Sequence, residues 1–436
     1  MGKRRIWLGL CMAAVLTGIL GATVQVGAAD KAGAADKTET VTVWSWDNNF
    51  NVKAMKLAEA EYEQEHPDVD IQVVSMEQEN IMDQLYNNLS AGIYEELPDI
   101  VLIEDYRVKA CLQRFGEEFL ELGDAVDYGN YVDYKVNAVT LDDRHYGVPF
   151  DSGAAVMFYR RDVLAQAGYS DEDMQDITWE RYTEIARDVY EATGMKMITL
   201  DPSDLGLLRI MLQSAGSWYV KDQGLTADIE DNQVLKEALD VYLKLLRAGI
   251  TASSNGWDEY VSSYQDGRVA TVISGCWSAS SIKEKAEQAG KWGVARIPRL
   301  EHCEGAVNAS GNGGSAWYVL KKGSDGAKAR DFLLEMYDQN PDFINLLMEE
   351  INLTSVRRDL DTFPNYEKKD DYFGGIPFLK ICADVVEDIP DVDFGSYTYE
   401  IEDVMASAIQ NLLKGESEEN VLRQAQIKAQ GIIGLK

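Results

Sequence analysis

The chain has 436 residues and is strongly acidic, with 74 Asp and Glu against 41 Lys and Arg and a formal net charge of −33. This charge argues against nucleic acid and anionic membrane surfaces as partners, because both are bound through basic patches. Hydrophobic residues make up 46% of the chain, which excludes a wholly disordered acidic protein, and the length predicts two or three domains.

Residues 1–28 have the pattern of a secretory signal peptide. Basic residues at positions 3–5 precede a long apolar run, and small residues at 26–28 supply a cleavage site. Cys11 lies early in the apolar run and follows a leucine, so we expect no lipid anchor at Cys11; the alternative is an uncleaved anchor helix. The protein is therefore expected outside the cytoplasm, secreted or associated with the cell envelope.

Residues 29–40 are rich in Ala, Gly, Lys, Asp and Thr without periodicity and are expected to form a tether. Strands and helices then alternate, which predicts βαβ units and a parallel sheet. In this part of the chain we expect strands at 41–44, 69–73 and 100–103, and helices at 52–65 and 80–91.

After residue 149 the pattern becomes richer in helices, with a brief return of strands. Thr178 is expected to cap a helix that begins at Trp179. Further strands are expected at 155–159, 269–273, 292–297 and 316–320, and further helices at 207–215, 235–248 and 401–413. The chain thus has an α/β block, a helical block, a return of strands and a final helical block. This order predicts two lobes with a cleft between them, and a chain that passes from one lobe to the other more than once.

Four cysteines follow the signal sequence, at positions 111, 276, 303 and 382. Their wide spacing identifies neither a disulfide nor a metal site. We expect buried thiols, with a bridge from Cys276 to Cys303 as the specific alternative. The chain has three widely spaced histidines, so we expect no metal site and no cofactor.

Aromatic, acidic and small residues cluster at the ends of the predicted strands, where open α/β sheets bind ligands. A sugar presents an apolar face for ring stacking and hydroxyls for carboxylates and amides, so this mixture predicts a saccharide site. The alternative for any single tryptophan is a core position, which we expect for Trp179 and Trp292. The candidate ligand-binding residues are Trp44, Trp46, Asp47, Glu104, Asp105, Asp151, Asp204, Trp218, Trp277, Asn312, Gly314, Ser315 and Tyr397.

The chain resembles the extracellular solute-binding proteins of carbohydrate ABC importers, in the maltose-binding-like group that includes lactose-binding-like members. The resemblance covers nearly the whole chain after the tether. It rests on segments 43–51, 97–106, 146–153, 158–162, 212–219, 270–277, 290–294, 308–317 and 394–399.

The resemblance implies a two-lobe periplasmic-binding-protein fold of type II, with a central cleft and a hinge near 148–152. It implies an N-terminal lobe of 41–149 plus 268–319 and a C-terminal lobe of 150–267 plus 320–436. It also implies that Trp277 and Tyr397 stack on sugar rings. Many relatives have Phe-Gly-Gly-Gln where this chain has Phe-Gly-Gly-Ile at 373–376, which implies that one amide contact to sugar is missing.

The sequence thus predicts a monomeric protein without catalytic activity that captures an oligosaccharide, closes by hinge motion and delivers the ligand to ABC permease subunits. Lactose, a related galactoside and a plant-derived oligosaccharide are the candidate ligands. The alternatives are a secreted glycoside hydrolase, which needs two carboxylates across the scissile bond, and an envelope carbohydrate-binding adhesin.

Overall fold

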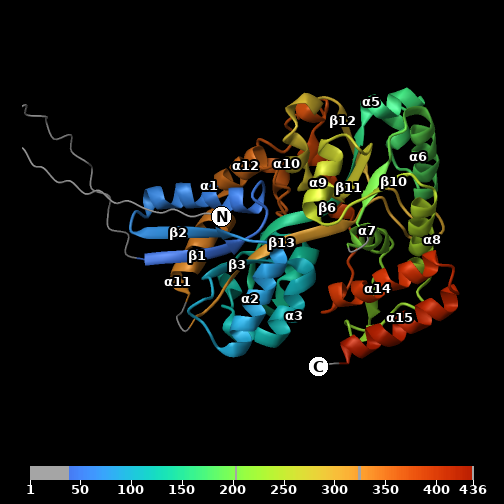
Figure 1. Cartoon of the computed structure of the whole chain (residues 1–436). Helices are drawn as coiled ribbons and strands as arrows, with labels where there is room; N and C mark the ends of the chain where they lie inside the picture. Colours follow the sequence, from blue (N-terminus) through green and yellow to red (C-terminus); the bar gives the residue numbers. More distant parts are fainter. Residues whose placement is uncertain (1–38, 202–203, 323–325, 435–436) are drawn as a thin grey trace, which may run out of the picture. The chain divides into compact units, whose positions relative to one another are not determined.

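Strand β6 (Gly147–Arg160) is the element around which the molecule is organised (Figure 1). A computed structural model describes residues 39–201, 204–322 and 326–434. The first half of β6 pairs antiparallel with β13 (Gly311–Val319). Its second half pairs antiparallel with β11 (Thr271–Gly275) and with β12 (Trp292–Arg296). One long strand therefore belongs to both lobes of this two-lobe α/β fold.

The sheet of the first lobe continues from β13 to β3 (Ile100–Glu104), then to β1 (Glu39–Ser45) and β2 (Val69–Ser75). Strand β1 is parallel to both of its neighbours, and β3 is antiparallel to β13. The apolar run in β3 is buried, as a continuous apolar strand should be. The predicted βαβ units are confirmed, and they place the carboxyl ends of β1, β2 and β3 at one edge.

Six helices accompany this sheet: α1 (Asn51–Glu65), α2 (Gln78–Ala91), α3 (Asp105–Phe115), α4 (Asp133–Ala138), α11 (Ala327–Leu333) and α12 (Pro341–Glu350). The last two come from the C-terminal part of the chain. The ring of Phe332 on α11 meets Tyr62 on α1 with centroids 4.9 Å apart. Lys53 on α1 lies 3.1 Å from the carboxylate of Glu350 on α12. The chain thus returns to the first lobe after β13.

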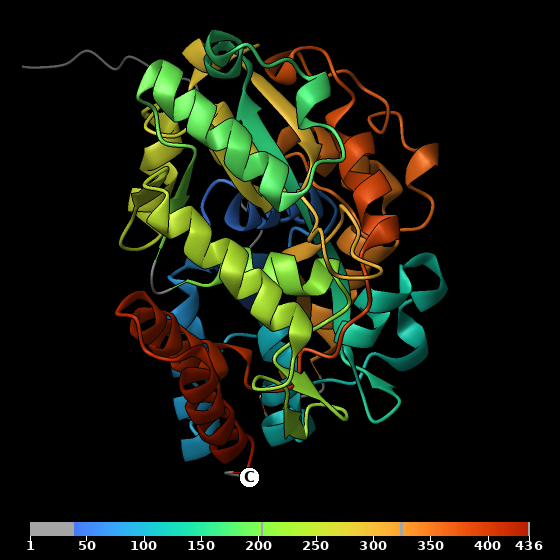
Figure 2. The same ribbon diagram turned by 90° about the vertical axis from the view of Figure 1, so that its right-hand side faces the viewer.

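The remaining helices are α5 (Arg161–Leu164), α6 (Trp179–Thr193), α7 (Gly206–Ser214), α8 (Gln233–Arg247), α9 (Trp257–Gln265), α10 (Ser278–Lys283), α13 (Phe378–Asp388), α14 (Thr398–Leu413) and α15 (Glu418–Ile433). Figure 2 shows α14 and α15 as the adjacent red helices near the C-terminus. Thr178 accepts a hydrogen bond from the Arg181 backbone N–H, so the predicted N-cap is confirmed. Trp179 and Trp292 are fully buried, as expected.

The short strands pair locally and are β4 (Thr140–Leu141), β5 (Arg144–His145), β7 (Ile198–Leu200), β8 (Val220–Lys221), β9 (Thr226–Ala227) and β10 (Thr251–Ser253). Strands β7 and β10 are parallel to each other. The Thr271 backbone N–H donates to the Met197 carbonyl, which joins the β7 segment to β11. The second lobe therefore has its own small sheet region beside β11.

The strand pairing differs from the expected lobe boundaries in two places. Residues 268–319 were expected in the N-terminal lobe, yet β11 and β12 pair with the second half of β6. Residues 320–436 were expected in the C-terminal lobe, yet α11 and α12 pack on α1. Periodicity predicts an element but not its partner, because every buried strand or helix presents the same apolar pattern.

The start of the chain is only partly described. The predicted signal peptide and residues 29–38 of the predicted tether lie outside the described residues. Residues 39 and 40 already belong to β1, so the strand begins two residues earlier than predicted. Across the described ranges, no helix combines the length and apolar character needed to cross a bilayer.

All four described cysteines are free thiols. The thiol of Cys276 donates to the Ser152 carbonyl at 3.4 Å, whereas that of Cys303 donates to the Glu237 carboxylate at 3.1 Å. The expected thiols are confirmed, although Cys303 is only partly buried. The alternative bridge from Cys276 to Cys303 is wrong for this structure, because the two thiols have different partners.

Candidate functional site

A cleft of about 1130 Å³ opens at the carboxyl ends of β1, β2 and β3. Its first wall is formed at the ends of these strands and just after them, by residues 46–51, residues 75–80, and Glu104 with Arg107. This is the position at which open α/β sheets bind ligands. The volume exceeds the range of about 300–1,000 Å³ typical of small-molecule pockets, so the cleft has room for a ligand of several rings.

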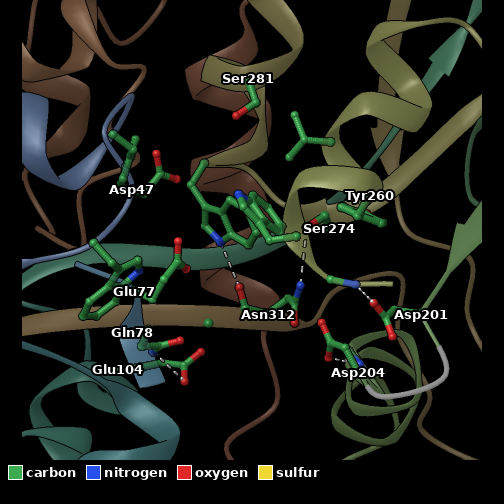
Figure 3. A pocket seen from close by; sticks show the side chains of 18 of the residues that line it. Asp47, Glu77, Gln78, Glu104, Asp201, Asp204, Tyr260, Ser274, Ser281 and Asn312 are labelled. Atoms are coloured by element: carbon green, nitrogen blue, oxygen red, sulfur yellow. Dashed lines mark hydrogen bonds between the residues drawn. The ribbon is translucent and has the colours of Figure 1, made fainter. Parts of the chain in front are cut away.

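The opposite wall comes from β7, α7, α9, β11, α10 and α14. Figure 3 shows Asp47 and Glu77 on one side of the cleft and Asp201 and Asp204 on the other, with Tyr260 beside them. Asp201 accepts a hydrogen bond from the Gly256 backbone N–H at 2.5 Å, which joins the loop after β7 to the start of α9. Polar groups therefore face the cleft from both lobes.

Three aromatic rings form one side of the cleft: Trp257, Tyr260 and Trp277. The Trp257 ring stacks on Tyr260 with centroids 5.6 Å apart, and it lies 5.4 Å from the Trp277 ring. The indole N–H of Trp277 donates to the Asn312 carbonyl at 3.0 Å, which fixes the orientation of the ring. Trp257 remains 42% exposed. Apolar ring surface at an accessible wall is suited to stacking on the apolar face of a sugar.

The segment Asn312 to Ser315 forms the floor of the cleft, and it is a bulged part of strand β13. Gly313 and Gly314 have φ angles of 82° and 99°, in the region that favours glycine. A side chain at position 314 would place its Cβ 2.7 Å from the Asp105 carboxylate. Glycine therefore lets the strand pass close to α3 while its backbone faces the cleft.

The carboxylate of Asp105 lies behind this floor and forms a buried ion pair with Lys135. The ammonium group of Lys135 is 2.7 Å from both carboxylate oxygens, and its side chain is fully buried. Burial raises the pKa of Asp105 to about 6, while the Lys135 charge acts in the opposite direction. The pair supports β13 from below and has no contact with the cleft space.

Two further acids reach the cleft from the first lobe, Asp47 and Asp151. Asp47 has a positive φ of 58° and accepts a hydrogen bond from the Asn49 backbone N–H at 3.0 Å. Asp151 accepts from both the backbone N–H and the hydroxyl of Ser315, at 2.7 and 2.6 Å. Burial raises the pKa of both carboxyl groups, because a charged carboxylate loses solvation there.

A buried network surrounds Arg209 on α7. Its guanidinium forms ion pairs with Asp204, at 2.9 Å, and with Glu402 on α14. Tyr219 donates its hydroxyl to Glu402 at 3.0 Å. Burial raises the pKa of Glu402 to about 7, and the positive charge of Arg209 opposes this shift. The network ties α14 to α7 on the second wall.

A polar contact joins the two walls at Glu104, which ends β3. Tyr399 on α14 donates its hydroxyl to Glu104 at 2.5 Å, and Gln78 on α2 donates to the same oxygen at 3.2 Å. The guanidinium of Arg107 lies 4.0 Å from the centre of the Tyr399 ring. We call Glu104, Arg107 and Tyr399 the inter-lobe clasp.

Most of the residues that the sequence predicted for the site do line the cleft. They are Trp46, Asp47, Glu104, Asp151, Asp204, Trp277, Asn312, Gly314 and Ser315. Four do not: Trp44, Asp105, Trp218 and Tyr397.

The four displaced residues have structural positions instead. Trp44 lies within β1 and is 6% exposed, packed in the core with residues of α2. Trp218 is 3% exposed and donates its indole N–H to Thr398. Asp105 pairs with Lys135. Tyr397 and Tyr399 both pack against the second-lobe core, and of the two it is Tyr399 that lines the cleft. Ile376 also lies outside the lining.

Several lining residues were not predicted from the sequence, including Asn51, Arg209, Trp257, Tyr399 and Glu402. Signals for three of them were present. Arg209 is the one charge in an otherwise apolar and polar-neutral helix, Gly206–Ser214, which indicates a buried partner. Tyr399 and Glu402 are three residues apart and so share a helix face.

The comparison with known proteins agrees with this architecture. The family described as Bacterial extracellular solute-binding protein matches residues 58–373. The chain belongs to this family. The solute-binding protein is 38% identical over 393 residues to the lactose-binding protein of Rhizobium radiobacter, covering 90% of this chain and 93% of that relative.

Solved structures share the fold of this solute-binding protein. One is the ABC transporter associated binding protein from B. animalis subsp. lactis in complex with β-1,6-galactobiose, with a TM-score of 0.75 and 24% identity over 89% of this chain and 96% of that one. Another is the GacH receptor of Streptomyces glaucescens, with a TM-score of 0.76 and 19% identity over 91% of this chain and 98% of that one. These likenesses establish the two-lobe fold.

Proposed function

We propose that this protein is the extracytoplasmic sugar-binding component of an ABC importer, which captures a galactoside such as lactose and delivers it to the permease. The observation that carries the proposal is the cleft wall in which Trp257, Tyr260 and Trp277 face a set of carboxylates. The name of the relative from Rhizobium radiobacter and the galactobiose complex of the structural neighbour support a galactoside.

The chemistry of the cleft supports the same ligand class. If one indole ring covers roughly 100 Å² of sugar face, its burial contributes about 2.5 kcal/mol. Two or three rings then supply most of the about 8 kcal/mol that corresponds to micromolar affinity. Carboxylates such as Asp47 and Asp151 accept hydrogen bonds from sugar hydroxyls and so select which sugar fits.

The inter-lobe clasp favours a closed arrangement of the two walls in this proposal. Replacing Tyr399 by phenylalanine keeps the ring under Arg107 and removes the hydroxyl that Glu104 accepts. We expect the affinity for sugar to fall by about 1 kcal/mol, roughly fivefold, because the closed state loses one hydrogen bond. Calorimetric titration measures the change.

The matched control for the clasp is Tyr169→Phe. Tyr169 also donates to a carboxylate, that of Asp188, at 2.5 Å, but both residues belong to one lobe. This variant is expected to bind with the affinity of the unmodified protein. Equal losses in the two variants would contradict a role for the clasp in closure.

The proposed function is tested by calorimetry of the intact protein against lactose, β-1,6-galactobiose, maltose and an arabino-oligosaccharide. We expect one-to-one binding at micromolar or lower dissociation constant for at least one galactoside. Absence of binding to every sugar by folded protein would overturn the proposal.

The same protein and sugar samples distinguish a binding protein from the alternative, a glycoside hydrolase. The family and the relatives named above are binding proteins. We propose that the chain has no catalytic activity, so prolonged incubation with lactose should release no glucose. Release of glucose at a rate proportional to protein concentration would favour the hydrolase. An adhesin for polymeric glycan would fail to be stabilised by any small sugar in a thermal melt.

The family is extracellular by its description. We propose that residues 1–28 act as a cleaved signal peptide, that the mature protein is a monomer, and that permease subunits are its membrane partners. Mass spectrometry of the exported protein tests the signal, since cleavage after Ala28 predicts an N-terminus at Ala29. An intact N-terminus would favour the anchor helix instead.

A further inference from the structure

The negative charge of the residues that line the cleft is not neutralised by basic residues of the same lining. Four lining acids, Asp47, Glu77, Asp151 and Asp258, form no ion pair with any lysine or arginine in the part of the chain that the structure describes. Glu77 and Asp258 are exposed at the cleft surface, while Asp151 is buried in the floor. A ligand that enters the cleft is therefore surrounded by negative charge.

The two arginines of the lining do not offset this charge. Arg107 faces two carboxylates, those of Glu79 and Glu104. Arg209 likewise faces two, those of Asp204 and Glu402. Each guanidinium retains an Nε–H with no hydrogen-bond partner among the described residues, which can donate to a neutral oxygen. Each arginine is already paired with two carboxylates, so neither can neutralise an additional carboxylate.

A buried acceptor in the same cleft is also unpartnered. Asn51 begins α1, lines the cleft and is 5% exposed. Its side-chain oxygen has no hydrogen-bond partner in the described ranges. An unsatisfied buried acceptor is costly unless the ligand supplies a donor. Hydroxyl and ammonium groups are donors, whereas an ionised carboxylate only accepts.

We propose that the cleft selects saccharides by charge: it binds neutral or amino-bearing sugars and rejects sugars that carry a carboxylate, such as uronosides. The inference rests on the proposed function and specifies its ligand class. The unpaired acids repel a uronate, and its carboxylate group offers no donor to the acceptors of the lining. Acidic plant-derived oligosaccharides are thereby excluded as ligands.

The test compares the affinities of a neutral and a charged lactose derivative that have nearly the same shape. Four derivatives of lactose are prepared. Two carry a carboxylate or a carboxamide at C6 of the galactose, and the other two carry the same groups at C6 of the glucose. The carboxamide has nearly the size of the carboxylate but no charge. For each ring, calorimetry at pH 7.5 and low salt gives the ratio of the two affinities.

We expect the carboxamide to bind at least tenfold more tightly than the carboxylate at a ring that contacts the cleft. The ratio should narrow as salt is raised, because exposed charges are then screened. It should also narrow in the double variant Glu77→Gln, Asp258→Asn, which removes two charges at the cleft surface. A carboxamide that binds no more tightly than its carboxylate at either ring would overturn the charge selection.

Failure of the charge selection can be distinguished from failure of the proposed function. If unmodified lactose, β-1,6-galactobiose and the other neutral sugars fail to bind, the proposed function fails. If neutral sugars bind and the carboxylates bind as tightly as the carboxamides, the function stands and the charge selection is wrong.

Discussion

Replacing Lys135 by methionine is expected to lower the free energy of unfolding by about 3–5 kcal/mol, because it leaves Asp105 buried without its counter-charge. Both carboxylate oxygens of Asp105 now accept from Lys135 at 2.7 Å, and both side chains are buried. Methionine fills a similar volume, so the loss reports the charge and not a cavity. Urea denaturation followed by circular dichroism measures it.

Two further variants separate this effect from general damage. The double variant Asp105→Asn, Lys135→Met removes both charges and should recover much of the lost stability, since an uncharged pair needs no counter-charge. The exposed pair of Lys368 and Glu349 is the matched control, and Lys368→Met should leave the denaturation midpoint unchanged. If Lys135→Met alone is as stable as the unmodified protein, the ion pair does not stabilise the floor of the cleft.

Replacing Trp277 by alanine is expected to weaken sugar binding by about 2 kcal/mol or more, roughly thirtyfold, because the central ring of the aromatic wall is lost. The indole also donates to the Asn312 carbonyl, so its loss frees one residue of the floor. Trp277→Phe keeps a ring without the N–H donor and should show a smaller loss. Calorimetry with the galactoside that binds best gives both values.

The control for this prediction is Tyr190→Ala. Tyr190 is 39% exposed on α6 and does not line the cleft, so its removal should change sugar affinity less than twofold. A thermal melt confirms that each variant is folded. Unchanged affinity in a folded Trp277→Ala protein would exclude the aromatic wall as the sugar platform.

The sequence predicted the elements well because their signals are local. The period-two pattern at 69–73 and the apolar run at 100–103 both became strands of the central sheet. Thr178 before Trp179 became an N-cap because its side chain reaches the first turn of its own helix. The expectation that ligand residues follow strand ends placed Trp46, Asp47 and Glu104 in the cleft.

Four predicted site residues do not line the cleft, because spacing does not specify the direction of a side chain. Trp44 is the last residue of the expected strand 41–44, and the strand pattern does not specify that its ring packs in the core with residues of α2. Tyr397 is the N-cap of α14 and Tyr399 lies in its first turn; both pack against the core, but Tyr399 also lines the cleft. Asp105 was placed in the site by its neighbours, but Lys135, 30 positions away in sequence, lies beside it in the fold.

The strand and helix pairing differs from the expected lobe boundaries for a related reason. The return of α11 and α12 to α1 depends on contacts such as Phe332 with Tyr62, which join residues far apart in the chain. The expected strand at 316–320 leaves out the first part of β13, because Gly311, Gly313 and Gly314 weaken the strand pattern there; the pairing of this part with β6 identifies it as a bulged strand.

A crystal structure of the protein with the galactoside that binds best is the direct test of sugar binding in the cleft. We expect the sugar to lie in the cleft, with one ring against Trp277 and hydroxyls that donate to Asp47 and to the side-chain oxygen of Asn51. Electron density for the sugar at any other surface, with the cleft holding solvent alone, would contradict it.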